Sequence, residues 1–194
     1  DPDITCHDRL DSSSGRGFIE FDQPKKVVEI AGCTGGMPAV ATSDLNNLFG
    51  LVKFYKAATA RGIKPIVACD VWVEDLDPTI EPSLLVLIAQ RQAGYKALSR
   101  LLSRGYSENH HNGRMILKRS WIQADSEGLL ALSAAADGDV GKAIVSGQLD
   151  EARRRAVFWQ ALFPDGYYLE IQRLDRANDE HHIAGAVQLS DELG

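Results

Sequence analysis

The chain has 194 residues, of which 44% are hydrophobic and 25% charged, and its formal net charge is −6 at pH 7. This composition is typical of a globular protein, and the length fits one domain or at most two small ones. The negative charge argues against non-specific nucleic-acid binding by this chain alone. No apolar run approaches the roughly 18 residues of a membrane-spanning helix, and residues 1–20 lack the pattern of a signal peptide. We therefore expect a cytoplasmic protein that makes no membrane contact.

The predicted elements alternate along the chain. Residues 1–17 carry no hydrophobic period and predict a loop. The apolar and β-branched runs predict strands at 39–42, 64–73, 84–89, 129–133 and 167–171. The helical spacing of apolar residues predicts helices at 25–30, 46–61, 92–104, 138–145, 149–163 and 178–193, with a short helix around Trp121. Polar loops are expected at 75–82 and 107–113. Short strands that are each followed by a helix favour an α/β fold with βα units around a parallel sheet or barrel.

The cysteines and glycines give no catalytic signature. Cys6, Cys33 and Cys69 are odd in number, widely spaced and outside any Cys-x-x-Cys pair. They therefore predict buried or free thiols in a reducing compartment, with neither a disulfide framework nor a zinc site. Residues 32–36 are glycine-rich but follow a predicted helix, so we interpret them as a turn. Phosphate-loop, dinucleotide-binding, nucleophile-elbow and zinc-protease motifs are absent from the sequence.

Histidines and charge runs are expected on the surface. His110–His111 fall in a predicted loop and His181–His182 on the predicted final helix. Adjacent residues of a helix point to different sides, so neither pair is suited to chelating a metal. We expect solvent-exposed histidines. The charged residues at 179–180 and 151–155 are likewise predicted to cover exposed helix faces.

Two carboxylates occupy positions where βα folds place their chemistry, at the carboxyl ends of strands. Asp44 follows the strand at 39–42, and Asp70 follows Cys69 in the next strand. Carboxylate oxygens bind hard cations, but two carboxylates alone supply few of the ligands that such a cation needs. His7 and Asp11 could join them only if the first segment folds onto the same edge.

Several sequence blocks, in order, resemble the polymerase-and-histidinol-phosphatase (PHP) domain, and more narrowly the PHP domain of the bacterial replicative DNA polymerase III alpha subunit. The blocks are 37–58 (MPAVATSDLNNLFGLVKFYKAA), 62–67 with Asp70, 84–89 with 94–98, 127–133 and 163–173. The likeness covers residues 24–194 and leaves 1–23 as a poorly matched segment. It implies a distorted, TIM-like βα barrel whose C-terminal strands lie beyond residue 194. An open seam of that kind predicts marginal stability or self-association.

The metal-binding pattern of active PHP members is altered in this chain. Those members use a His-x-His pair, an Asp-His pair, a Glu, a further His and often a Cys. The corresponding positions here are Arg9, Asp11, Asp44, Leu45, Asp70, Ser83 and Ala135. Arginine offers no lone pair to a cation, and the family's last Asp and His ligands would follow Gly194. Because only Asp44 and Asp70 could still ligate, the resemblance implies a vestigial site with no cofactor.

Two functions follow from the resemblance. In the first, the chain is the N-terminal PHP domain of a replicative DNA polymerase, itself without catalysis. It would brace the rest of the alpha subunit and dock the proofreading exonuclease subunit, and DNA would be bound only by the whole polymerase. In the second, it is a metal-dependent phosphoesterase or 3′–5′ proofreading exonuclease with Zn or Mn held by Asp44 and Asp70. A free-standing βα protein that shares only the fold stays open as well.

The tryptophans are candidate anchors for a partner by residue type alone. For Trp72, Trp121 and Trp159 the sequence favours burial in the core over a docking role.

Overall fold

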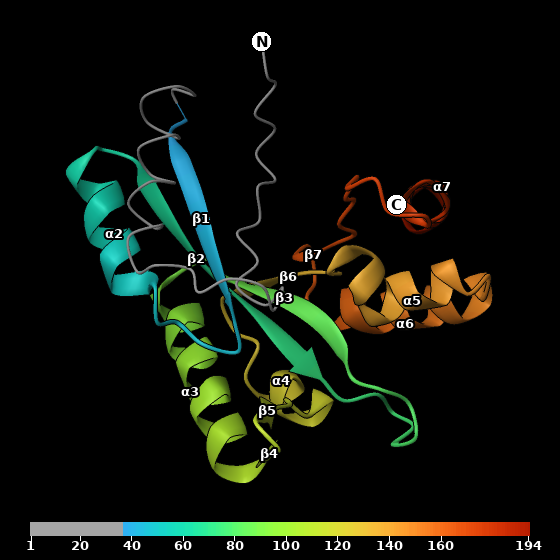
Figure 1. The fold of residues 1–194 in the computed structure, drawn as a ribbon, viewed down its shortest axis with the longest axis horizontal. Coiled ribbons are helices and arrows are strands. Elements are labelled where there is room, and N and C mark those ends of the chain that lie inside the picture. The colour runs from blue at the N-terminus through green and yellow to red at the C-terminus, as the bar shows by residue number, and fades with distance from the viewer. Residues whose placement is uncertain (1–36) are drawn as a thin grey trace. The chain divides into compact units, whose positions relative to one another are not determined.

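The computed structural model describes residues 37–194, which fall into two compact units (Figure 1). The first unit ends at Asp70, and the second runs from Val71 to Gly194. The expectations for 1–23, for the helix at 25–30 and for the turn at 32–36 lie outside the described residues, as do Cys6 and Cys33.

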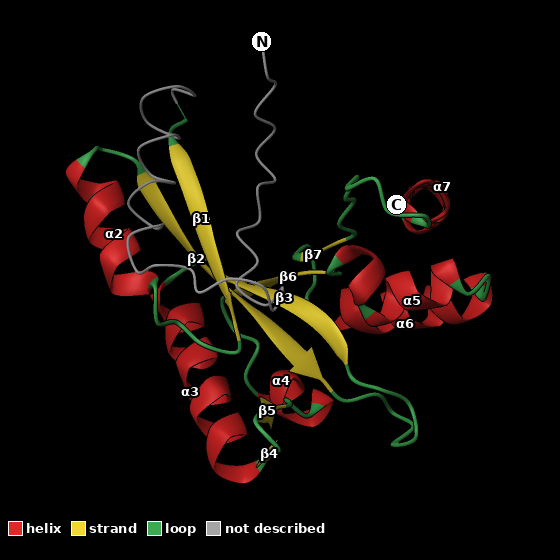
Figure 2. Cartoon of the chain, in the orientation of Figure 1, coloured by secondary structure: helices red, strands yellow, loops and turns green. Residues whose placement is uncertain are grey.

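The first unit is a βαβ unit. Strand β1 (Ala39–Leu45) leads to helix α2 (Leu51–Ala60), and strand β2 (Lys64–Val73) follows and continues into the second unit (Figure 2). The two strands pair in parallel, from Ala39 opposite Lys64 to Leu45 opposite Asp70. A parallel pair needs a crossover connection, and α2 supplies it.

Helix α2 is amphipathic and packs its apolar face into a small core. Its buried residues pack with the residue just before β2 and with residues just before and at the beginning of β1; this core contains Phe54, Ala57, Ala58, Ile63, Met37 and Val40. The helix starts later than residue 46, where the periodicity places it. Asn46 adopts a left-handed φ of 58°, and the Asn47 side chain accepts a hydrogen bond from the Phe49 N–H at 2.9 Å. These turn conformations compete with helix until Leu51.

The second unit holds the remaining elements. In chain order they are β3 (Ser83–Ala89), α3 (Gln92–Glu108), β4 (His110–His111), β5 (Arg114–Met115), α4 (Arg119–Ala124), β6 (Leu129–Leu132), the 3₁₀ turn η1 (Ala135–Asp137), α5 (Asp139–Val145), α6 (Leu149–Leu162), β7 (Tyr167–Tyr168) and α7 (Asp179–Leu193). Strand β3 buries Leu85, Val86 and Leu87 in succession, because both of its faces are covered.

The sheet of the second unit is mixed, which corrects the expectation of parallel pairing alone. Strand β3 pairs antiparallel with β6, and β6 pairs parallel with β7. The chain leaves β3 through α3 and returns to the same end of β3, where the Gln90 N–H donates to the Gly128 carbonyl at 3.0 Å. A strand that enters at this end must run antiparallel.

Three further features also differ from the sequence pattern. Helix α3 continues to Glu108, and a hairpin of β4 and β5 replaces the expected loop at 107–113. Its turn is Asn112-Gly113, with φ of 51° and 76°, the conformation that a two-residue hairpin requires. Strand β7 has two residues where five were expected.

Helices α5, α6 and α7 pack against one another, and α3 packs on β3 and β6. Figure 1 shows α5 and α6 lying side by side. Within residues 37–194, no helix combines the length and the apolar character needed to cross a bilayer.

Candidate functional site

The carboxyl ends of β1 and β2 carry the two candidate metal ligands. Along the ladder Asp44 lies opposite Cys69, and Leu45 lies opposite Asp70. Residues paired across a ladder share a face, and successive residues alternate between faces. Asp44 and Asp70 therefore belong to opposite faces of the β1–β2 pair.

Asp44 serves the turn that leads into α2. Its Oδ2 accepts a hydrogen bond from the Gly50 N–H at 2.9 Å, just before the helix begins. On the same face, the Cys69 thiol donates to the backbone carbonyls of Asp44 at 3.2 Å and Asn47 at 3.4 Å. Burial raises the pKa of the Cys69 thiol, and the Asp70 carboxylate raises it further. The expected buried thiol is confirmed at Cys69.

Asp70 lies on the other face and is buried. Its Oδ1 accepts a hydrogen bond from the Ser43 hydroxyl at 2.5 Å, and its backbone carbonyl accepts one from the Asn46 N–H at 2.7 Å. The residue opposite Asp70 in the ladder is Leu45, whose side chain offers no ligand atom.

The residues described here do not fit a metal centre. Two carboxylates on opposite faces of a strand pair cannot bind one ion together, and Leu45 takes the place of an imidazole. Among residues 37–194, no group of three or more His, Cys, Asp or Glu side chains is arranged to hold a metal. His7, Arg9 and Asp11 fall outside the described part of the chain.

The remaining two positions of the family pattern lie in the second unit. Ser83 opens β3 and is buried, and its hydroxyl has no hydrogen-bond partner. Ala135 is buried in η1 and has a φ of 47°, after Ala134 at 57°. Both alanines thus sit in the left-handed region that glycine favours.

The histidines follow the surface expectation in part. His110, His111 and His181 are exposed, as predicted. His182 is buried, which corrects the expectation, because α7 turns it toward the second unit's interior. Burial lowers the pKa of His182.

Asp179, which was expected on an exposed helix face, is buried as well. Its Oδ2 accepts hydrogen bonds from the Leu174 and Arg176 N–H groups at 2.6 and 3.1 Å.

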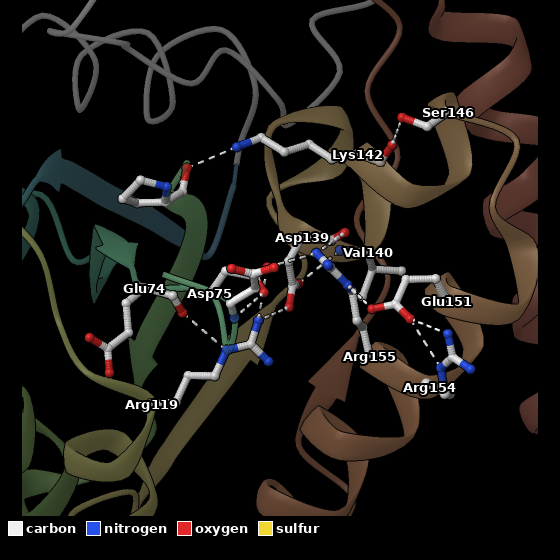
Figure 3. A network of polar contacts seen from close by, with 12 residues as sticks. Glu74, Asp75, Arg119, Asp139, Val140, Lys142, Ser146, Glu151, Arg154 and Arg155 are labelled. Carbon is white, nitrogen blue, oxygen red and sulfur yellow. Dashed lines mark hydrogen bonds and ion pairs between the residues drawn. The ribbon is translucent and has the colours of Figure 1, made fainter. Parts of the chain in front are cut away.

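The second unit contains a buried charge network that periodicity did not indicate (Figure 3). Its centre is the ion pair between Arg119 of α4 and Asp139 of α5, with Nη2 and Oδ2 2.8 Å apart. Their exposed fractions are 6% and 3%. Arg119 Nε also donates to the Glu74 carbonyl at 3.1 Å, and Trp159 Nε1 donates to Asp139 Oδ2 at 3.0 Å.

A second arginine extends this network to the loop after β2. Arg155 of α6 lies with Nη1 3.1 Å from Asp75 Oδ2, and it donates to the Asp139 carbonyl at 3.2 Å. Glu151 accepts from Arg155 Nε at 2.7 Å. Asp75 Oδ2 is buried without a well-aligned hydrogen bond, and its negative charge is balanced by Arg155 and by Arg119, whose Nη2 lies 3.8 Å away. The run at 151–155 is thus not wholly exposed, because Arg155 turns inward.

This network joins four segments of the second unit and holds no nucleophile beside a base. Lys142 Nζ donates to the Pro82 carbonyl at 2.8 Å and ties α5 to the end of the same loop. Burial lowers the pKa of Lys142 and raises that of Tyr167. The arrangement is structural: each buried charge faces an opposite one.

The tryptophans are mostly interior, as the sequence favoured. Trp159 and Trp121 are buried, and Trp72 is half-buried. The guanidinium of Arg104 lies 4.5 Å from the Trp121 ring centroid, and that of Arg114 lies 4.8 Å from the Trp72 ring centroid. None of the three is presented as an open anchor.

Two bacterial relatives of this chain carry the same name. The chain is 47% identical over 159 residues to the DNA polymerase III subunit alpha of Pseudomonas fluorescens, an alignment covering 82% of this chain and 14% of that protein. It is 37% identical to the Escherichia coli (strain K12) protein of the same name, again over 82% of this chain and 14% of the relative. The chain therefore spans only about 14% of the length of these relatives.

The fold has a counterpart among solved structures. An amidohydrolase from Chromobacterium violaceum superposes with a TM-score of 0.53 at 14% identity, covering 88% of this chain and 78% of the amidohydrolase. At that identity the likeness concerns the fold alone and agrees with the expected α/β class. The model of the PHP domain matches residues 22–174, which is most of the sequence. The chain belongs to the PHP domain family.

Proposed function

We propose that this chain is the PHP domain of a bacterial replicative DNA polymerase III alpha subunit, and that it acts as a structural and docking module without metal catalysis. In that role it braces the rest of the alpha subunit and receives the proofreading exonuclease subunit. Nucleotide addition and DNA binding belong to parts of the polymerase outside this chain. Its place of action is the cytoplasm, where bacterial DNA is replicated.

The position of Leu45 opposite Asp70 supports the absence of a metal. A catalytic cation needs several ligands that converge from one side. On the Asp70 face the neighbouring strand supplies an apolar side chain and the Ser43 hydroxyl, which already donates to Asp70. On the other face Asp44 holds the Gly50 N–H. The identity of 37–47% to the alpha subunits supports the polymerase context.

The metal part of this proposal is tested on the purified chain. After dialysis against Zn²⁺ or Mn²⁺, we expect less than one bound metal per chain by elemental analysis. We also expect no hydrolysis of bis(p-nitrophenyl) phosphate above the buffer rate. Asp70→Asn and Asp44→Asn keep an oxygen acceptor for Ser43 and Gly50, so they test ligation with little effect on folding. Stoichiometric metal together with hydrolysis that Asp70→Asn abolishes would overturn the proposal.

The docking part has its own measurement. The chain and the exonuclease subunit from the same organism should co-elute in size-exclusion chromatography. Separate elution at micromolar concentrations of both proteins would remove the docking role and leave the metal part unaffected.

One observation favours the second function, a metal-dependent phosphoesterase or exonuclease. Asp70 is a buried carboxylate at the carboxyl end of a parallel strand, where such enzymes place ligands. The same elemental analysis decides between the two functions.

A further inference from the structure

Helix α2 and the turn before it expose an apolar stripe. Phe49 is 80% exposed, Val52 63% and Tyr55 52%. Their spacing of three residues places them along one side of the helix, opposite the buried Phe54 and Ala58. Contiguous exposed apolar side chains of this size mark interaction sites more often than isolated ones do.

The stripe is presented by an ordered turn. The Asn47 side chain accepts from the Phe49 N–H at 2.9 Å and donates to the Leu45 carbonyl at 2.7 Å. The Gly50 N–H is held by Asp44. An aromatic side chain on a fixed turn loses little conformational freedom when a partner covers it, and this favours binding.

The charge around the stripe is positive, although the chain as a whole is negative. Residues 45–69 contain two lysines on α2, Lys53 and Lys56, and Arg61 and Lys64 after it, with no Asp or Glu. Both helix lysines are exposed beside the apolar side chains. The flanking Asp44 and Asp70 reduce the net charge to +2 over residues 44–70, and within a chain of −6 this surplus favours a partner that brings carboxylates.

We propose that this stripe, Phe49, Val52 and Tyr55 with Lys53 and Lys56, docks an acidic, apolar segment of a separate protein. The segment would place apolar side chains on the stripe and carboxylates beside the two lysines. The inference goes beyond the proposed scaffold role, which names no surface. A negative result here would therefore leave that role untouched.

Two other occupants fit the stripe less well. Nucleic acid is recognised mainly through phosphates, whereas the three side chains at the centre of the stripe offer them a single donor, the Tyr55 hydroxyl. A second copy could offer its own loop at 74–82, in which Leu76 is 78% exposed and Ile80 43%. However, the Asp77 carboxylate of that loop accepts from the Thr79 hydroxyl at 2.7 Å, and Glu81 pairs with Arg114 at 3.4 Å. Asp75 is buried in the charge network.

Site-specific photo-crosslinking in the full-length gene product, within its native cells, tests the proposal. Tyr55 is replaced by p-benzoylphenylalanine, and Tyr95 on α3, 41% exposed, is replaced in the same way as the matched control. After irradiation, adducts are mapped by mass spectrometry. We expect an adduct at position 55 with a separate protein, at a segment that carries at least two carboxylates within about five residues of the link.

Charge reversal makes this test specific. Lys56→Glu should lower the crosslinking yield at position 55 by about fivefold or more. Lys96→Glu, a matched exposed lysine on α3, should leave the yield unchanged. Phe49→Ser should lower the yield too, while circular dichroism confirms that each variant is folded.

Several outcomes would overturn the proposal. These are adducts mainly with nucleic acid, with the same polypeptide or with a second copy, or no adduct above the Tyr95 control. A mapped segment without carboxylates, or a yield that Lys56→Glu does not change, would overturn it as well.

Discussion

Asp44 and Asp70 lie on neighbouring strands one residue out of register, so their carboxylates leave the ladder from opposite faces. One holds the turn before α2, and the other accepts a hydrogen bond from Ser43. The same register places the apolar side chain of Leu45, and not a second carboxylate, beside Asp70.

The turn before α2 should depend on Asp44. Asp44→Ala removes the acceptor of the Gly50 N–H, and we expect a loss of about 1–2 kcal/mol in the free energy of unfolding. Urea unfolding followed by circular dichroism measures it. Asp44→Asn, which keeps an acceptor oxygen, should cost clearly less, and equal losses for the two variants would contradict this assignment.

The buried network should be sensitive to the loss of either partner. Asp139→Asn removes the nearer of the two carboxylates that face Arg119 and leaves only Asp75 at 3.8 Å, and we expect a loss of about 3 kcal/mol. Arg119→Met should cost a similar amount, and the double variant should cost less than the sum, because the two residues are coupled. Glu127→Gln, in an exposed pair with Arg91, is the control and should change stability by under about 1 kcal/mol. Additive losses in the double variant would count against the network.

The approach of two backbone segments at Gly138 should forbid any side chain there. A Cβ at this position would overlap the Ser133 carbonyl oxygen. We expect Gly138→Ala to destabilise the protein by about 2–3 kcal/mol in thermal or urea unfolding. Gly166→Ala is the matched control, because its Cβ would lie 3.0 Å from a methyl group of Leu130 that can move. The prediction is wrong if both variants are equally stable.

His182 should make stability depend on pH. Its folded-state pKa is depressed by burial below the ordinary value of 6.5, so the unfolded chain binds a proton more readily. The stability that neutral His182 contributes is therefore fully present above pH 6.5, and it is lost as the pH falls through the folded-state pKa. We expect the wild-type free energy of unfolding to drop between about pH 7 and pH 5 more steeply than that of His182→Gln. His181→Gln, at an exposed position, should follow the wild type.

The sequence predicted the elements better than their pairing. The strands at 64–73 and 84–89 match β2 and β3 closely, because continuous apolar runs leave few alternatives. The direction of β6 did not follow from its composition, since an apolar tetrapeptide pairs equally well either way. The hairpin at β4 and β5 carried a local signal, Asn112-Gly113, which the polar character of its surroundings obscured.

The candidate site was predictable in its positions and only partly in its geometry. Asp44 and Asp70 do lie at the strand ends. Their opposite faces depend on the pairing register, which neither strand specifies alone. The network of Arg119 and Asp139 could not be foreseen, because the two residues are 20 positions apart and meet only through tertiary packing. His182 was misassigned for the same reason.

The buried thiol of Cys69 provides the first unit with an intrinsic reporter of opening. While β2 is in place, the sulfur is fully covered and its pKa is raised, so a thiol reagent has neither access nor a thiolate to attack. Modification of Cys69, mapped by mass spectrometry, therefore proceeds only through molecules in which β1 and α2 have separated from β2. The rate of Cys69 modification, divided by the rate in an unfolded peptide, gives the fraction of molecules in which the strands have separated. The native sulfur atom thus reports local unfolding without any engineered label.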